Sequence, residues 1–596
     1  MNRLFLTPLL IFLLVSTICA QNDGKNLFDN TFLHQIKFES STISNNDLWD
    51  SLSDEYSMVN MIVDGERVDS VGIRHKGFTS KASEQKPLKI DINEYVKGKK
   101  YDGLKKFNLH NNFKDDYLQR ERLAYELYRR AGLPSPRTSY AEVFVGDNFV
   151  GVYSIVEQID KTFLKHNFPS DEGSLIKAEP PGIVPGLMLE VKQGTMDEFN
   201  FFRNNANASN FDDFVHLRSF LKQMAVDIII EDWDSYSYNR HNFYVYYEEK
   251  SELLNFINYD HNYAFAVNDP NKFLYPLGTY PLSNSLLEDP VMKQMYEQTL
   301  CELLQYLLDA DYIVNETTNN YNIISSNNNG VKASDPASLI QYITDRKTWL
   351  QDTLVNLNVV CNDLDYPYEL NDLVINEFVA WSDSAGGIQE PNGGTPDWIE
   401  LYNNSSSDII LNKNFYLSDD ENFPKKWYFP EEIVIPSKDY LIIWADKDVH
   451  QQGIHAGFKI EKSGGDLLMT YENMSEIQQV SYEQQSLNMA NARVPNGTGN
   501  FMIQELTFNS NNGNLVGIED AKDWEVRLYP NPADEYIWLS SNQTVNRLII
   551  INLAGQVMRQ INDPLFPVTI HDLEPGVYFF KINANTQEYI QKIFVK

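Results

Sequence analysis

HNFYVYYEEKSELLNFINYDHNYAF, residues 241–265, is the part of the sequence that points most directly to a fold and to a site. Two runs of alternating aromatic and aliphatic residues, 243–247 and 253–257, flank the polar sequence EEKSE, and this pattern predicts a β-hairpin. We therefore expect Asn242 and Asp260 to lie side by side at the open end of the hairpin. An amide oxygen and a carboxylate together suit a hard cation such as Mg²⁺. The alternative is that both residues only cap strand ends.

Around this hairpin, the amino-terminal half of the chain mixes strands with helices. Further hairpins are predicted about Asp64-Gly65 and about residues 146–148, and PLKIDINEY, residues 87–95, has the alternation of a strand. The helices that we expect are 115–130, 212–230, 290–308 and 338–357. Strands that come first and helices that come later predict an α+β domain with two lobes.

The composition changes after Cys361, and this change sets the domain boundaries. With 596 residues the chain is long enough for roughly four domains. Residues 361–371 are acidic and contain a proline, and short strands and turns then recur in the pattern of a β-sandwich. The predicted organisation is a signal peptide at 1–20, an α+β domain at 27–360, a linker at 361–371, a β-sandwich at 372–507, a linker at 508–525 and a small β-module at 526–596.

The first twenty residues have a basic start and an apolar run too short to span a bilayer comfortably, which predicts a cleaved secretory signal. No other stretch has the pattern of a transmembrane segment. Once the signal is removed, Cys301 and Cys361 are the remaining cysteines of an exported chain. They either form a disulfide or stay as two buried thiols.

The charge balance excludes some classes of partner. The chain has 83 acidic and 49 basic residues and a net charge of −34, which argues against binding to nucleic acid or to an anionic membrane. Residues 71–100 reverse this balance, with eight Lys and Arg residues against three acidic ones. A local excess of this kind suits a phosphate-rich ligand, because charges beyond about 8 Å are screened. A lysine-rich, solvated sheet edge is the alternative.

Several ordered motifs resemble the spore-coat kinase family, CotH. They are SVGIRHKGFTS at 70–80 with KPLKI at 86–90, FVGDNFVGVYSIVEQID at 144–160, EDWDSYSYNRHNFYVYY at 231–247 and NYDHNYAF at 258–265. The resemblance covers roughly residues 32–350. It implies an atypical protein-kinase-like fold with two lobes and an exported kinase that transfers the γ-phosphoryl group of ATP to a hydroxyl on a protein, using Mg²⁺ or Mn²⁺.

The same resemblance implies roles for individual residues. Asp234 is the candidate catalytic base, and Asn242 and Asp260 are the candidate metal ligands. Asn239 is a rival to Asn242, because it stands five residues after Asp234, the spacing found in protein kinases. The phrase HNFYVY favours Asn242.

Four further residues are candidates for cofactor binding. Arg74, Lys76 and Lys89 would contact the phosphates of ATP, with Lys86 as an alternative to Lys89. Glu157 would face the nucleotide or orient a lysine, and a structural ion pair is its alternative role.

The chain also departs from the family pattern. Asn262 stands where a second acidic residue is more usual, so one metal ligand loses its charge. Phe78 and Thr79 replace smaller polar residues after Gly77. These departures favour a second hypothesis, in which the kinase-like domain is catalytically inactive and the protein is a surface adhesion or scaffold protein. The abundance of aromatic residues leaves a third hypothesis, a carbohydrate-binding protein.

The two remaining modules have resemblances of their own. VINEFVA, DWIELYN and DYLIIWAD, within residues 374–446, resemble the lamin-tail domain, an immunoglobulin-like sandwich, in which we expect Trp398 to be a core residue. LYPNPA, INLAGQV and DLEPGVYFFKI, within residues 528–582, resemble the sorting domain of type IX secretion. That resemblance implies passage through the periplasm, the secretion machinery as a partner, and release to the medium or the cell surface.

Overall fold

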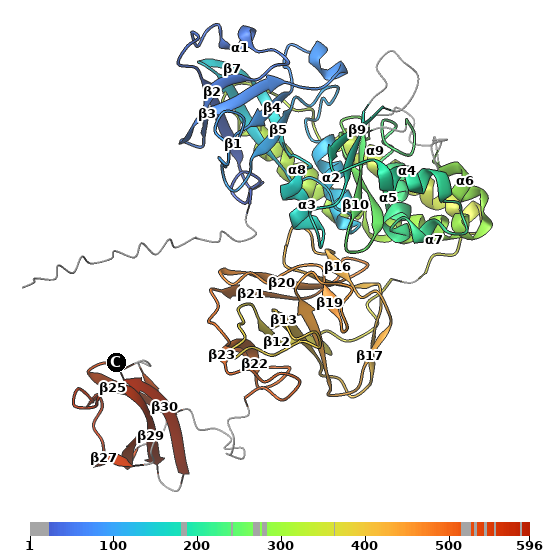
Figure 1. The fold of residues 1–596 in the computed structure, drawn as a ribbon. Coiled ribbons are helices and arrows are strands. Elements are labelled where there is room, and N and C mark those ends of the chain that lie inside the picture. The colour runs from blue at the N-terminus through green and yellow to red at the C-terminus, as the bar shows by residue number, and fades with distance from the viewer. Residues whose placement is uncertain are drawn as a thin grey trace, which may run out of the picture. The chain divides into compact units, whose positions relative to one another are not determined.

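The computed structural model describes residues 23–179, 188–239, 242–265, 274–276, 283–362, 364–513, 526–529, 533–541, 545–552, 556–584 and 587–595. Its segments divide into two compact units, residues 1–513 and residues 514–596 (Figure 1). The signal peptide predicted at 1–20 lies outside the described residues, as does most of the linker predicted at 508–525.

The first seven strands close into a barrel in the order β1-β2-β3-β4-β5-β7-β6, in which β1 and β6 are parallel and the other pairs are antiparallel. Alternate side chains of β2 point into an apolar core, as the period of a strand requires. The turn at Asp64-Gly65 has positive φ at both residues, 51° and 89°, which is why a short Asp-Gly hairpin forms there. The bounds are β1 Leu33–Glu39, β2 Ser57–Val63, β3 Glu66–His75, β4 Leu88–Asp91, β5 Lys106–His110, β6 Thr138–Val145 and β7 Asn148–Glu157.

A second sheet, in the order β11-β10-β8-β9, is antiparallel throughout. Its strands are β8 Leu175–Glu179, β9 Met188–Gln193, β10 Phe243–Glu248 and β11 Leu253–Asn258. The predicted hairpin is therefore present, with Phe243 opposite Asn258, so Asn242 and Asp260 both stand at its open end.

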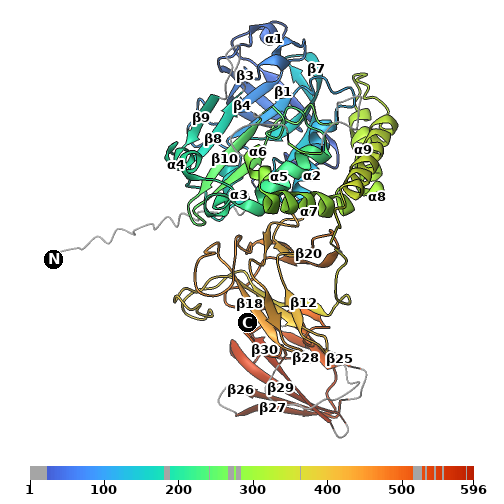
Figure 2. The same ribbon diagram turned by 90° about the vertical axis from the view of Figure 1, so that its right-hand side faces the viewer.

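Helices pack around this second sheet and form one large apolar core with it (Figure 2). They are α2 Arg120–Arg130, α4 Asp197–Asn205, α5 Leu217–Ile229, α6 Ser283–Glu288, α7 Pro290–Tyr306, α8 Ala310–Ser325 and α9 Ala337–Asn356, with the short element η2 Phe211–Asp213. Helix α3 Lys161–Asn167 packs on the same sheet in a separate small cluster, whereas α1 Leu48–Ser51 packs on the barrel core and η1 Thr79–Ala82 follows β3. The helices predicted at 290–308 and 338–357 are confirmed, and α3, α4, α6 and α8 were missed.

Two predicted helices start later than the sequence pattern indicates. Helix α2 begins at Arg120 rather than at residue 115, because Lys114 and Leu118 have positive φ and the Asp115 carboxylate accepts the Arg120 backbone N–H at 2.7 Å. Helix α5 begins at Leu217 rather than at residue 212, because the His216 backbone N–H donates to the Leu254 carbonyl of the second sheet. Local backbone geometry and a local hydrogen bond thus fix the start of α2, and a tertiary hydrogen bond fixes the start of α5.

Residues 373–504 form a β-rich, immunoglobulin-like module with strands only. Its sheets are β19-β18-β13-β12-β22-β23, β14-β17 and β16-β15-β20-β21. The bounds are β12 Leu373–Val379, β13 Trp398–Asn403, β14 Ile409–Leu411, β15 Phe415–Ser418, β16 Trp427–Tyr428, β17 Ile433–Ile435, β18 Tyr440–Ala445, β19 His455–Ala456, β20 Gly464–Tyr471, β21 Glu476–Glu483, β22 Ala490–Val494 and β23 Asn500–Gln504. Trp398 is fully buried, as predicted.

The carboxyl-terminal unit has two sheets, β24-β25-β28 and β27-β26-β29-β30, around a small apolar core. Its strands are β24 Val526–Tyr529, β25 Tyr536–Ser541, β26 Arg547–Asn552, β27 Val557–Asn562, β28 Val568–Thr569, β29 Gly576–Ala584 and β30 Gln587–Val595. Residues 530–532 of the LYPNPA motif and residues 553–555 of INLAGQV lie outside the described residues.

Glu472, just after β20 of the sandwich, is buried against the helical part of the first unit. Its carboxylate forms ion pairs with Lys222 of α5 at 2.9 Å, with Arg218 at 2.8 Å and with Lys425 at 3.3 Å, and it accepts a hydrogen bond from the Tyr306 hydroxyl. Burial opposes ionisation, yet the three cations hold the pKa of Glu472 well below its usual range. The sandwich is thus joined to the helices by a buried ionic cluster.

We expect Glu472→Gln to destabilise the chain by about 3–5 kcal/mol, because it leaves Lys222 and Lys425 buried without a counter-charge. Urea unfolding monitored by tryptophan fluorescence measures the change. Glu476→Gln, at an exposed position of β21, is the matched control and should unfold like the wild type. Equal unfolding midpoints for the two variants would contradict the expectation.

Cys301 of α7 and Cys361 form a disulfide with a Cα–Cα distance of 5.5 Å, which decides between the two alternatives left by the sequence. The bond closes a loop across a separation of 60 residues.

We expect the Cys301→Ser/Cys361→Ser double variant to lose up to about 4 kcal/mol of stability, since the unfolded chain gains conformational freedom. Dithiothreitol should lower the thermal midpoint of the wild type and leave that of the variant unchanged.

Candidate functional site

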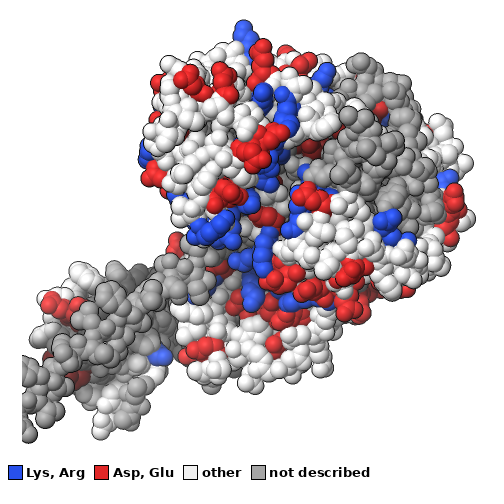
Figure 3. Space-filling view, turned by 45° about the horizontal axis from the view of Figure 1, so that its top comes forward, with Lys and Arg blue, Asp and Glu red and all other residues white. Residues whose placement is uncertain are grey.

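A cavity of about 990 Å³ is lined by β3, β4 and β5 of the barrel, by β8 and β9 of the second sheet, and by the residues after β11. Its described lining includes the basic residues Arg74, Lys76, Lys89, Lys106, Lys161, Lys177 and Lys192, and the acidic residues Asp160, Glu190, Asp234 and Asp260. In Figure 3, Lys and Arg side chains gather along the hollowed middle of one face, with Asp and Glu beside them. Basic residues therefore predominate here, although the whole chain is acidic.

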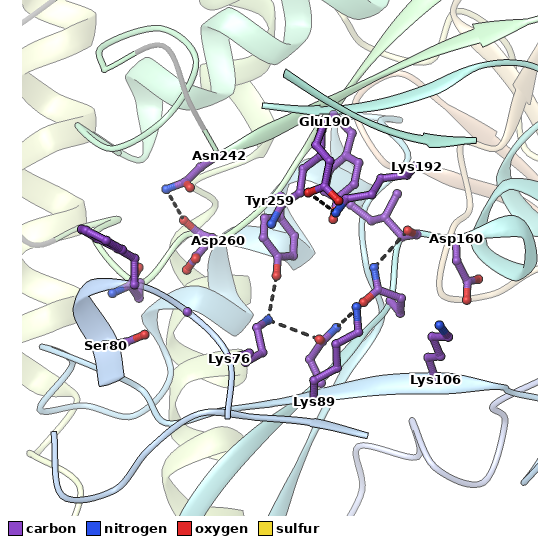
Figure 4. A pocket seen from close by; sticks show the side chains of 18 of the residues that line it. Lys76, Ser80, Lys89, Lys106, Asp160, Glu190, Lys192, Asn242, Tyr259 and Asp260 are labelled. Carbon is purple, nitrogen blue, oxygen red and sulfur yellow. Dashed lines mark hydrogen bonds and ion pairs between the residues drawn. The ribbon is translucent and has the colours of Figure 1, made fainter. Parts of the chain in front are cut away.

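Asp234, Asn242 and Asp260 meet on one side of this cavity. The Asn242 amide donates to Asp234 Oδ2 at 3.1 Å and, more weakly, to the Asp260 carbonyl at 3.4 Å. Asn242 and Asp260 lie next to each other in Figure 4. Asn242 and Asp260 both have left-handed backbones, with φ of 58° and 61°, so the chain turns sharply where it enters and leaves the hairpin. These turns bring together an amide and two carboxylates from segments up to 26 residues apart.

Asn239 has a different place. Its amide donates to the other oxygen of Asp234, Oδ1, at 3.0 Å. Of the two rival residues, the described cavity lining includes Asn242 and does not include Asn239. Both amides together orient the Asp234 carboxylate.

A row of polar residues crosses the barrel strands at the opposite side. Arg74 of β3 lies directly opposite Lys89 of β4, and Lys89 lies opposite Asn108 of β5. Residues paired in this way on one sheet point to the same face, so the three side chains form one patch. Burial, with the charges of Lys106 and Arg74 acting in the same direction, lowers the pKa of Lys89 to about 8.

Lys76 follows β3 and lies between the barrel and the second sheet (Figure 4). Its ammonium donates to the Tyr259 hydroxyl at 2.7 Å and to Asn108 Oδ1 at 3.2 Å, and it lies 2.7 Å from His110 Nε2. Burial lowers the pKa of Lys76 to about 7, and the Asp260 carboxylate opposes this shift. An anion in the cavity would therefore favour the charged form of Lys76.

His110 and Glu121 extend this network away from the cavity. His110 Nδ1 lies 2.8 Å from Glu121 Oε1, and Glu121, on α2, is fully buried. One ligand atom from each of His110, Glu121 and Asp260 lies within 4.8 Å of the others, a spacing compatible with a metal ion. Four further lysines, Lys106, Lys161, Lys177 and Lys192, were not singled out in the sequence and also line the cavity.

Sequence reasoning missed Asn108, His110, Glu121 and Tyr259. One signal was available, because KFNLH in β5 places Lys106, Asn108 and His110 at alternate positions of a strand, which is unusual unless that face lines a polar cavity. Glu121 and Tyr259 gave no such signal, since their contacts come from separate elements.

Two further candidates are placed by the structure. Lys89 lines the cavity, whereas the described lining does not include its alternative, Lys86. Nor does it include Glu157, whose carboxylate is paired with Arg137 at 2.6 Å and 3.0 Å. Glu157 is the last residue of β7, and its side chain pairs with Arg137. This contact agrees with the structural ion pair and not with a cofactor contact.

The positions that depart from the family pattern also lie at the cavity. Asn262 donates to the Phe113 carbonyl at 3.0 Å, and Phe78, Thr79 and Ser80 form one edge of the lining, with Phe78 largely exposed. Gly77 has φ of +81°, and a Cβ there would lie 2.5 Å from Ser80 Oγ, so a side chain at this position would disturb the turn.

Comparisons with known proteins agree with the resemblances found in the sequence. Residues 73–350 match the family model described as CotH kinase protein, residues 367–484 match the Lamin Tail Domain, and residues 527–596 match the Secretion system C-terminal sorting domain. The inner spore coat protein H of Bacillus subtilis (strain 168) is 20% identical over 346 residues, which cover 52% of this chain and 92% of that protein. All three predicted resemblances are confirmed.

The match to a sorting domain points to export and to a place at the cell surface or in the medium. Across the described residues, every helix is too short or too polar to cross a membrane.

We expect the contribution of Lys76 to stability to rise with pH. Its folded pKa of about 7 lies below the ordinary value of 10.5, so between these values the unfolded chain binds more protons, and raising the pH favours the folded state. In urea unfolding at pH 7, 8 and 9, the stability difference between wild type and Lys76→Met should shift by at most about 1.4 kcal/mol per pH unit. Lys105→Met, at an exposed position, is the control. Parallel pH profiles for wild type and Lys76→Met would contradict the expectation.

Proposed function

We propose that this chain, whose residues 73–350 match the CotH kinase protein family, is an exported kinase that transfers the γ-phosphoryl group of ATP to a hydroxyl on a protein acceptor. The observation that carries the proposal is the single cavity in which Asp234, Asn242 and Asp260 face Arg74 and Lys89. The cavity volume, about 990 Å³, is at the upper end of the range of about 300–1,000 Å³ for small-molecule sites.

The residues on the acidic side fit a divalent cation such as Mg²⁺ or Mn²⁺. Asp260 offers a carboxylate and Asn242 an amide oxygen, and hard cations prefer oxygen ligands of this kind. The left-handed backbones at both positions keep these groups together. When bound, the cation would neutralise charge on the phosphates.

The basic side fits the phosphates. Arg74 and Lys89 lie opposite each other on neighbouring strands, so they present two cations at one place on the cavity wall. Lys76 adds a third, and a phosphate near its ammonium would return its pKa toward the ordinary value. These three residues would bind and orient the triphosphate without covalent chemistry, which is the main requirement for phosphoryl transfer.

Asp234 would act on the acceptor. The acceptor oxygen forms a bond to the γ-phosphorus while the bond from that phosphorus to the bridging oxygen of ADP breaks, and Asp234 orients the hydroxyl and takes its proton. Hydrogen bonds from Asn239 and Asn242 hold both oxygens of Asp234 in place for this role. The barrel and the second sheet, on either side of the cavity, would correspond to the two lobes of an atypical kinase.

Asp234→Asn is expected to lower phosphoryl transfer by about 10²–10⁴-fold while ATP still binds, because it removes a proton acceptor and leaves the phosphate contacts intact. The measurement uses the tag-free full chain, labelled ATP, Mg²⁺ or Mn²⁺, and transfer to the chain itself or to a generic protein acceptor. Asp212→Asn, at an exposed position, is the matched control. If the wild type transfers no label, or transfers as much as Asp234→Asn, the proposed activity is excluded.

A second candidate function is a catalytically inactive surface adhesion or scaffold protein. Asn262 favours it, since this neutral side chain lines the cavity and donates to the Phe113 carbonyl where a carboxylate would have strengthened the metal site. An inactive protein would show no thermal shift with ATP and metal. A shift that Asp260→Asn abolishes would argue against this candidate.

A further inference from the structure

Glu390, Asp446 and His455 form a buried cluster in the sandwich, outside the cavity described above. Asp446 follows β18, His455 begins β19, and Glu390 comes from the long connection between β12 and β13. The side chains are 8%, 7% and 0% exposed respectively. One ligand atom from each lies within 4.8 Å of the other two.

The His455 ring is surrounded by hydrogen-bond acceptors. Nδ1 lies 3.0 Å from both oxygens of Asp446, which fixes the proton of a neutral ring on Nδ1. Nε2 then carries a lone pair, yet its neighbours are the Gln452 carbonyl at 3.2 Å and Glu390 Oε2 at 3.9 Å, both of which also present lone pairs. A cation is needed between these atoms, and it is either a proton on Nε2 or a metal ion.

The Glu390 carboxylate favours the metal ion. Within the part of the chain that the structure describes, Glu390 Oε2 is buried and has no hydrogen-bond partner. A buried carboxylate oxygen without a donor, such as Glu390 Oε2, is costly. At 3.9 Å, a proton on Nε2 would not form a hydrogen bond with it.

His34 provides an internal comparison. Its Nδ1 also contacts a carboxylate, Asp64 Oδ2 at 2.7 Å, and its Nε2 contacts the Asp29 carbonyl at 2.8 Å. That ring has a carboxylate and a carbonyl within hydrogen-bond distance, and no second acidic side chain is grouped with it among the described residues. The extra buried carboxylate is what sets the His455 cluster apart.

We propose that His455 and Glu390 bind a divalent transition-metal ion of the Zn²⁺ class, with Asp446 orienting the ring through Nδ1. Imidazole and carboxylate are ligands that such ions accept, and a carboxylate behind a ligating histidine is a common supporting contact. The ion would tie the connection that carries Glu390 to strands β18 and β19. It would therefore stabilise the sandwich and take no part in phosphoryl transfer.

Metal binding by the tag-free full chain tests the proposal. The protein is stripped with a chelator, incubated with Zn²⁺ alone, desalted and analysed for bound zinc and for its thermal midpoint. We expect about one Zn²⁺ per chain and a raised midpoint, both lost in Glu390→Gln and in His455→Gln. His450→Gln, an exposed histidine of the same loop, and His34→Gln serve as matched controls and should keep the ion. Asp260→Ala should also keep it, which separates this site from the cavity.

Co²⁺ provides a second readout that does not depend on stability. A histidine and carboxylate site of low coordination number should give visible absorption bands with Co²⁺, and Glu390→Gln should abolish them. Near-ultraviolet circular dichroism, which reports the packing of Trp444 beside the cluster, checks that the variants are folded. No bound zinc in the wild type, or equal zinc in wild type and folded Glu390→Gln, would overturn the proposal.

Discussion

The ammonium of Lys76 is the contact on which the arrangement of the candidate site depends. It bonds to Asn108 and lies against His110, both on β5 of the barrel, and it donates to Tyr259, which follows the second sheet. Tyr259 is the neighbour of Asp260 in sequence, so the position of the acidic side of the cavity is tied to the position of the basic side. A buried ammonium costs free energy unless its N–H groups are hydrogen-bonded. This contact therefore holds the barrel and the second sheet in a fixed relative position.

A second buried ionic contact joins the sandwich to the helices. Glu472 is held ionised by Lys222, Arg218 and Lys425, although burial opposes its charge. A contact of this kind does more to fix geometry than to add stability, since its desolvation offsets much of the attraction. The sandwich is consequently part of the same compact unit as the barrel and the second sheet, whereas the carboxyl-terminal module forms a unit of its own.

The local charge of the cavity contrasts with the charge of the chain. The net charge of −34 is distributed over the surface, while seven basic side chains line one cavity beside four acidic ones. Several of these lysines are paired, such as Lys106 with Asp91 and Lys192 with Glu190, so the cavity is a mixed polar site rather than a simple basic patch. This mixture suits a ligand that brings both phosphates and a cation.

Strand periodicity and short-range turn chemistry were enough to predict the hairpin at 243–258, the Asp-Gly turn, the α+β and β-sandwich regions and the proximity of Asn242 to Asp260. Four contacts became visible only in the folded chain: Lys76 with Tyr259, Glu121 with His110, Glu157 with Arg137, and the Cys301–Cys361 disulfide. Tertiary packing also moved the start of α5 and revealed the His455 cluster. The physical reason is that such contacts join residues separated by up to 183 positions, and their formation depends on how whole sheets and helices pack rather than on any local pattern.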